Sequence, residues 1–382
     1  MFAEDLPRRV FAEDLLRRGR KWLFFMELAD AKVRSTPRSP LATVGRYWSW
    51  LFLLLIVLFF SLAGPGFFDL FNFQSIGANM AFIMLMALGQ TFVIISGGVD
   101  LSTGYVMGLS AISTSLVITR MPASTPFVLL ILVGIIGGLI SGLIAGSISG
   151  IIIARLHVPP FIVTLGMLGI ARGAAFLLSG GQPVSVETPG IGQIGNGYLL
   201  YYVPTTGFSF FKLPTDLHGA RARDVVQILP YQLLVMLILV AFCAWLLSRT
   251  RFGRHTYAVG GNAEASSRAG IPVTRHVFLV YVLSALFAAG AGVLYVFRFT
   301  NGAADAGDPL LLDSIAAVVI GGASLFGGEG TIIGTLIGAL IIAIIQNGLV
   351  IIAVAPFWQF IAVGTVIILA VLIDQAKARI TQ

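Results

Sequence analysis

Long apolar runs separated by short polar or glycine-rich breaks constrain this chain more than any other feature. A helix that crosses the hydrocarbon core of a bilayer needs about 20 mostly apolar residues. We therefore predict an all-α polytopic membrane protein with ten transmembrane helices. The predicted spans are 46–63, 75–96, 101–118, 126–153, 159–179, 230–248, 277–297, 311–326, 331–353 and 355–373.

Composition supports a membrane protein and argues against several classes of site. Hydrophobic residues make up 57% of the 382 residues and charged residues only 11%, against about 25% in globular domains. The single Cys243 excludes an intrachain disulfide, and the four histidines are scattered without a metal-binding spacing. No Gly-Lys dipeptide occurs, so the chain has no phosphate-binding loop for ATP. We expect no cofactor or metal on this chain, and the basic residues flank apolar runs in a way that does not indicate nucleic acid.

The distribution of Lys and Arg predicts the orientation in the membrane. With the N-terminus inside, 18 of the 24 Lys and Arg residues fall on the cytoplasmic side, and the reverse topology would invert this bias. Both termini should then be cytoplasmic. The domains are a basic tail at 1–45, a transmembrane region at 46–373 and a short tail at 374–382. The first tail could lie on membrane lipid or be disordered.

The polar stretch 249–276 is the most informative loop, because it carries five arginines against one acid and so should face the cytoplasm. Asn262 is a helix N-cap candidate, Ala-Glu-Ala favours a helix, and Gly270 with Pro272 would end it. We expect a short helix on the inner face of the membrane, although a solvated connector would also fit the pattern. The residues proposed to couple the chain to a partner are Gly260, Gly261, Asn262, Glu264, Ala265, Arg268 and Gly270.

Two outer loops follow from this topology. Residues 180–229 are long and rich in aromatic residues and turn formers, and residues 300–310 carry Asp305 and Asp308 without a base. The long loop could dock a partner or simply connect two spans.

Glycines recur every fourth residue in two spans and predict close helix packing. An offset of 196 residues maps the first set, with Pro160 and Phe161, onto the second set, with Pro356 and Phe357. Because the two spans run in opposite directions, this correspondence indicates an inverted repeat, a feature of many transporters. Chance in a glycine-rich chain is the alternative. The packing residues are Gly134, Gly138 and Gly142, and Gly330, Gly334 and Gly338.

Polar side chains within apolar runs are costly and so mark a possible pathway. Asp100 could cap the third span near the inner interface, an interpretation that we favour over substrate contact. Neutral hydroxyl and amide groups suit an uncharged polyhydroxy solute, and helix–helix hydrogen bonds would use the same groups. The proposed pathway residues are Asn79, Gln90, Thr91, Ser96, Asp100 and Thr164.

Three stretches resemble a known family. The segments ALGQTFVIISGGVDLSTGYVMGLSA (87–111), FGRHTYAVGGNAEASSRAGI (252–271) and AAVVIGGASLFGGEGTIIGTLIGALI (316–341) are similar to the permease subunit of ribose-type monosaccharide ABC importers. The resemblance covers about residues 46 to 373 but not the tail or much of 180–229. It implies a fold like that of the vitamin B12-type (type II) importers, and a coupling helix near Gly261–Gly270.

The resemblance also implies partners. These are an ABC-type ATPase that binds ATP and Mg, a periplasmic sugar-binding protein, and a second permease subunit, identical or similar, in a bacterial inner membrane. The substrate would be a monosaccharide such as ribose, or galactofuranose or myo-inositol, and the chain itself would not be an enzyme. Alternatives are a secondary transporter or channel acting alone, and a permease for branched-chain amino acids.

Overall fold

The computed structural model describes residues 40–205, 207–212, 225–355 and 357–381. The chain divides into residues 1–48, of which only the start of α2 is described, and residues 49–382, which hold the rest of that helix and every other element. The N-terminal half contains α2 (Pro40–Ala63), α3 (Leu70–Ile95), α4 (Thr103–Arg120), α5 (Phe127–Leu156), α6 (Pro160–Ser179), β1 (Val184–Ser185) and α7 (Ile191–Asn196).

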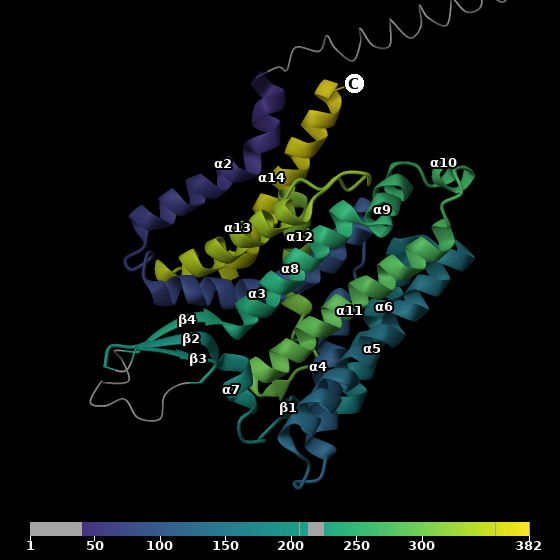
Figure 1. Cartoon of the computed structure of the whole chain (residues 1–382). Coiled ribbons are helices and arrows are strands. Elements are labelled where there is room, and N and C mark those ends of the chain that lie inside the picture. Colours follow the sequence, from purple (N-terminus) through teal and green to yellow (C-terminus); the bar gives the residue numbers. More distant parts are fainter. Residues whose placement is uncertain (1–39, 206, 213–224, 356, 382) are drawn as a thin grey trace, which may run out of the picture. The chain divides into compact units, whose positions relative to one another are not determined.

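The remaining elements include two helices on the loop between α8 and α11 (Figure 1). They are β2 (Tyr198–Val203), β3 (Gly207–Phe210), β4 (Val226–Pro230), α8 (Tyr231–Arg249), α9 (Arg251–Gly261), α10 (Ala263–Arg268), α11 (Val273–Phe299), β5 (Asn301–Gly302), α12 (Asp308–Ile320), α13 (Ile332–Ile351) and α14 (Phe357–Thr381).

Six helices of the described residues are long and apolar enough to cross a membrane. They are α3, α5, α6, α8, α11 and α13. Shorter apolar stretches lie in α2 (Trp48–Ala63) and α14 (Phe357–Leu369). The chain is therefore a multi-pass membrane protein.

The predicted span at 311–326 is wrong in its length. Helix α12 has only 13 residues and ends at Ile320, so it rises about 20 Å, less than a bilayer core. The residues that follow turn through Gly321 and Gly322 and stay non-helical up to Thr331. Glycine-rich backbone interrupts the apolar run, and hydropathy alone did not detect the break.

Helix α3 lies at the centre of the fold. Its most apolar window is 94% buried, against 22% for α5 and 28% for α6 and α8. It packs against α8, α11, α12 and α13, whereas α5 packs against α4 and α11 and leaves most of its surface free. A helix that is apolar on all sides is either surrounded by other helices or exposed to lipid. In this fold α3 is of the first kind and α5 of the second.

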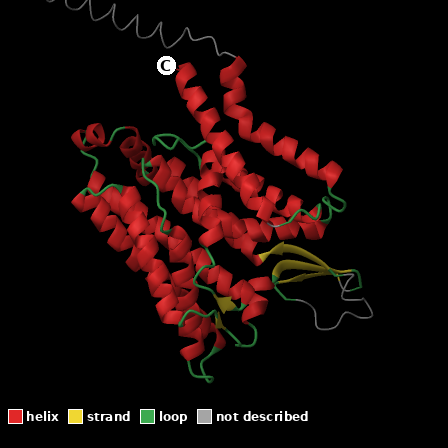
Figure 2. Cartoon of the chain, turned by 180° about the vertical axis from the view of Figure 1, so that it is seen from behind, coloured by secondary structure: helices red, strands yellow, loops and turns green. Residues whose placement is uncertain are grey.

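The segment 180–229, predicted to be an outer loop, contains more structure than the sequence indicated. Strand β1 pairs with β5, which joins this loop to the segment after α11. Strands β3, β2 and β4 form an antiparallel sheet in that order. Both views show this sheet extending away from the helices (Figures 1 and 2).

Candidate functional site

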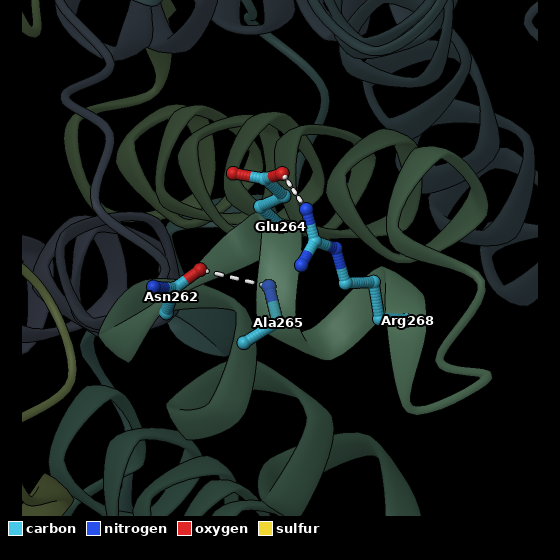
Figure 3. A network of polar contacts seen from close by, with 4 residues as sticks. All are labelled: Asn262, Glu264, Ala265 and Arg268. Atoms are coloured by element: carbon cyan, nitrogen blue, oxygen red, sulfur yellow. Dashed lines mark hydrogen bonds and ion pairs between the residues drawn. The ribbon is translucent and has the colours of Figure 1, made fainter.

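The short helix predicted in the polar stretch 249–276 is present as α10, and its N-cap is confirmed. The Asn262 side chain accepts a hydrogen bond from the Ala265 amide at 2.8 Å (Figure 3). The end of the helix is also as predicted, because Gly270 adopts φ +84°, which glycine reaches without a side-chain clash. The amides of Gly270 and Ile271 donate to Ser267 O and Ser266 O, which satisfies the last carbonyl groups of the helix.

Helix α10 is open to solvent on nearly every side. Of residues 261–270 only Ser266 is buried. Glu264 and Arg268 form an ion pair of 2.6 Å, and both side chains are more than three-quarters exposed (Figure 3). Residues four apart share a helix face, so this spacing puts the two side chains within reach of each other. Such exposed pairs contribute little to stability, and their charges stay available to a partner.

Helix α9 is the element that the sequence interpretation missed. No helix was predicted directly before Asn262, but residues 251–261 are helical and Gly253, Thr256 and Val259 are buried. The signal was present in the sequence, because these buried residues recur at three-residue spacing while Arg251, Arg254 and Gly261 lie exposed. Thr256 Oγ1 meets His276 Nε2 at 3.1 Å, and the Phe252 ring lies 4.7 Å from the ring of His276. Helix α9 is thereby fixed to the first turn of α11.

Four glycines bring α9 against two breaks between membrane helices. We call Gly97, Gly260, Gly327 and Gly328 the glycine junction. A Cβ atom at Gly260 would lie 1.7 Å from Ile95 O, and one at Gly327 would lie 2.8 Å from Gly260 O. The Gly328 amide also donates to Ile95 O at 2.8 Å. Only residues without side chains allow these three backbone segments to approach so closely.

Tyr257 adds a polar contact beside the glycine junction. Its hydroxyl donates to Gly330 O at 2.7 Å, which joins α9 to the residue just before α13. Burial raises the pKa of Tyr257 above its usual value, so the hydroxyl remains a donor at neutral pH. Helix α9 thus contacts the end of α3, the start of α11 and the segment just before α13.

The predicted pathway residues divide into a buried cluster and isolated positions. Gln90 is buried and donates both to Asp100 O and to Thr103 Oγ1. Thr164 approaches Val99 O of the same loop at 3.4 Å. Thr91 instead meets Thr335 Oγ1 of α13 at 2.8 Å.

The other two predicted pathway positions lie apart from the cluster. Ser96 donates to Val93 O within its own turn. Asn79 is exposed and accepts a hydrogen bond from Arg298 at 3.3 Å.

The expectation that Asp100 caps the third span is wrong, because the N-cap residue of α4 is Ser102. The buried Asp100 carboxylate accepts from the Ser102 amide at 3.0 Å and from its hydroxyl at 2.6 Å. Its other oxygen accepts from Ser284 of α11 at 2.8 Å. Ser284 lies 184 residues away along the chain, so no local signal could have identified this partner. Asp100 therefore holds the α3–α4 connection to the middle of α11.

The glycine face of α5 lies where this helix meets α4 and α11. A Cβ atom at Gly138 would lie 2.2 Å from Thr114 Oγ1, and one at Gly142 would lie 2.4 Å from Ala289 Cβ. Gly134 faces Ile118 in the same way. In α13, Gly334 and Gly338 approach Gly321 O and Ala317 O, while Gly330 lies before the helix and approaches Ala323 and Ile95.

Comparisons with known proteins point to one family. The family model described as branched-chain amino acid transport system / permease component matches residues 73–372. A ribose import permease protein of Bacillus subtilis is 37% identical over 326 residues, which cover 85% of this chain and 91% of that protein.

Two further relatives are named for other sugars. A fructose import permease protein of Rhizobium meliloti is 35% identical, covering 84% of this chain and 82% of that protein. A galactose/methyl galactoside import permease protein of Escherichia coli is 34% identical, covering 87% and 94%. No solved structure gave a significant match. The chain therefore belongs to the family of permease components of ABC importers, and within it resembles the ribose-type permeases over most of its length.

Proposed function

We propose that the chain is the membrane-spanning subunit of an ATP-driven importer for a monosaccharide or a sugar-like polyol. The observation that carries this proposal is the pairing of α10 with α9. The first carries exposed charges, and the second joins it to the end of α3 and to the break before α13 through the glycine junction and Tyr257. The relatives named for ribose, fructose and galactose support a sugar as the substrate.

In this proposal ATP and Mg bind to an ABC-type ATPase, which contacts α10 on the cytoplasmic side. Closure of the ATPase displaces α10, and α9 transmits the displacement to the end of α3 and the approach to α13. A periplasmic sugar-binding protein delivers the substrate on the outer side. A second permease subunit, identical or similar, completes the pathway, which the residues Asn79, Gln90, Thr91, Ser96, Asp100 and Thr164 would help to line or support.

We further propose a type II fold with ten membrane-associated helices arranged as an inverted repeat. The packing supports this repeat, because one helix of each half packs on helices of the other half. Helix α11 packs on α4 and α5, and α3 packs on α12 and α13. Helix α4 packs on α5 and α6, and α12 packs on α13 and α14. The first turns of α4 and α12 meet at Gly104 and Gly307, where a Cβ atom at either glycine would lie less than 3 Å from the carbonyl oxygen of the other.

Labelling tests the orientation with both termini in the cytoplasm. A cysteine at the exposed Ser267 should react only from the cytoplasmic side, and one at the exposed Pro204 only from the periplasm. Reaction of Ser267→Cys from the periplasm would contradict the proposed coupling role of α10.

Uptake in proteoliposomes tests the function. We expect substrate uptake to need the ATPase, ATP and the binding protein together. Uptake driven by an ion gradient without them would indicate a secondary transporter. The description of the matching family names branched-chain amino acids, which makes them the second candidate substrate class. Thermal-shift measurement of the binding protein with sugars, polyols and branched-chain amino acids distinguishes the two.

A further inference from the structure

The three-stranded sheet of the outer loop presents an apolar face to its surroundings. Cross-strand partners lie on the same side of an antiparallel sheet. Phe208, Tyr202 and Val226 therefore form one row, and Phe210, Leu200 and Ile228 form the next. Phe208 and Phe210 are about two-thirds exposed, and the rings of Tyr202 and Phe208 lie 5.0 Å apart. We call these six residues the apolar grid.

The opposite side of the sheet faces the protein. Tyr201 and Val203 alternate with the grid residues of β2 and are only 7% and 0% exposed. In water, a sheet with one buried face has polar residues on its other face. Here the outer face is apolar as well. Leu200 and Ile228 are half-buried, but Tyr202, Phe208, Phe210 and Val226 are exposed and so require an apolar environment that the described residues do not provide.

Contacts with two membrane helices place the sheet at the level of the bilayer surface. The Gln74 side chain donates to Gln227 O of β4, and Gln74 lies four residues, or about 6 Å, into α3. Pro230 ends β4 and is the N-cap of α8, another spanning helix. Val226 is four residues away from it, at most about 13 Å. The interfacial zone on each side of a bilayer is about 5 to 8 Å thick. Much of the grid therefore lies within reach of this zone.

The chemistry of the surroundings favours lipid over a protein partner. No grid residue carries a charge, whereas specific protein interfaces have a polar rim and hydrogen-bonding groups. Phe71, in the first turn of α3, is 77% exposed and lies near Tyr198 and Pro230 of the sheet. Lys212 follows β3 and is exposed, as suits a site near lipid phosphates. Aromatic side chains with a nearby cation are typical of the membrane–water interface.

We propose that the β2–β3–β4 sheet is a membrane contact whose apolar grid lies in the outer-leaflet interface, on phospholipid rather than on a protein. The sheet would hold the outer ends of α3 and α8 at a defined depth. This contact does not depend on the proposed substrate or on the ATPase.

Alternation along β3 tests the proposal directly. Single cysteines at Phe208, Ser209 and Phe210 are introduced in a Cys243→Ala background, because Cys243 is the chain's single cysteine and is buried. Each is labelled with the fluorophore NBD, and the full chain is placed in phosphatidylcholine nanodiscs. Since neighbouring strand residues point to opposite faces, we expect doxyl lipid to quench the 208 and 210 labels at least about twofold more than the 209 label. Aqueous iodide should not prefer the 208 and 210 labels.

Tyr202→Cys on β2 provides a second probe of the same face, and gel filtration checks that each variant keeps the wild-type elution volume. Equal lipid quenching at 208, 209 and 210 would overturn the proposal. So would strong iodide quenching at 208 and 210 that disappears only when the binding protein or a second permease copy is added, because a protein would then cover the grid.

Discussion

Helices α9 and α10 are neighbours in the segment between α8 and α11, but their environments differ sharply. Helix α9 buries Gly253, Thr256 and Val259 and contacts α3, α8 and α11. Helix α10 buries only Ser266 and carries an exposed ion pair. One helix is part of the membrane domain, and the other is held out from it as a free surface. If a partner displaces α10, as we propose, the packing of α9 on α3, α8 and α11 provides a route for that displacement into the membrane helices.

The largest expected effect comes from closing the space at the glycine junction. Gly260→Ala places a methyl group 1.7 Å from Ile95 O, and neither backbone can move aside easily. Overpacking of this kind costs roughly 1–3 kcal/mol. We expect near-complete loss of ATP-driven uptake and a lower unfolding temperature of the purified permease.

Gly261→Ala is the matched control, since a Cβ atom there meets nothing within 4 Å. It should keep the wild-type unfolding temperature. Similar losses from both variants would show that the loop is sensitive to any side chain and would remove the distinction between the two positions.

A charge reversal on α10 tests the free surface. Glu264→Arg breaks the ion pair with Arg268 and presents two like charges to the ATPase. We expect membrane insertion to be unchanged, and ATPase recruitment and uptake to fall about tenfold, which corresponds to about 1.4 kcal/mol. Pull-down of the ATPase and uptake in cells measure both.

Ser248→Ala, at the end of α8, should recruit the ATPase normally. If Glu264→Arg combined with Arg268→Glu also behaves like the wild type, α10 is a connector and α9 transmits no signal from it.

Tyr257→Phe tests the polar contact between α9 and Gly330. Loss of one neutral hydrogen bond costs about 0.5–1.5 kcal/mol. We expect ATP hydrolysis to continue while less substrate is transported per ATP, because the position of α9 beside α13 loosens. Measured ATP-to-substrate stoichiometry in proteoliposomes is the readout. An unchanged ratio would mean that the glycine junction alone positions α9.

The smallest effect is expected for Arg268→Ala on the stability of the isolated permease. Both partners of the ion pair are exposed, so the loss should be below about 0.5 kcal/mol. Thermal unfolding of the purified chain measures it. A larger shift would show that α10 packs against the membrane domain and would weaken the contrast with α9.

Signals that act over a few residues were sufficient for much of the fold and for α10. Six of the ten predicted spans match helices long and apolar enough to cross a membrane. Asn262 and Gly270 predicted the ends of α10, and the spacing of Glu264 and Arg268 placed both on one face of that helix. Capping and i,i+4 pairing are interactions within one turn or two, so the local sequence determines them. The glycine spacing in α5 likewise identified a face for close packing, though not which helix it meets.

Only the tertiary structure decided the contacts between distant segments. The partner of Asp100 is Ser284, and the glycine junction joins residues near 97, 260 and 327. Each residue type alone fits several structures: an aspartate fits a cap, and a glycine fits a flexible linker. The arrangement of the helices selects among them, because burial makes an unpaired carboxylate or an extra methyl group costly. Helix α12 likewise ends at Gly321, where Gly334 of α13 approaches, and this contact was not visible in its hydropathy.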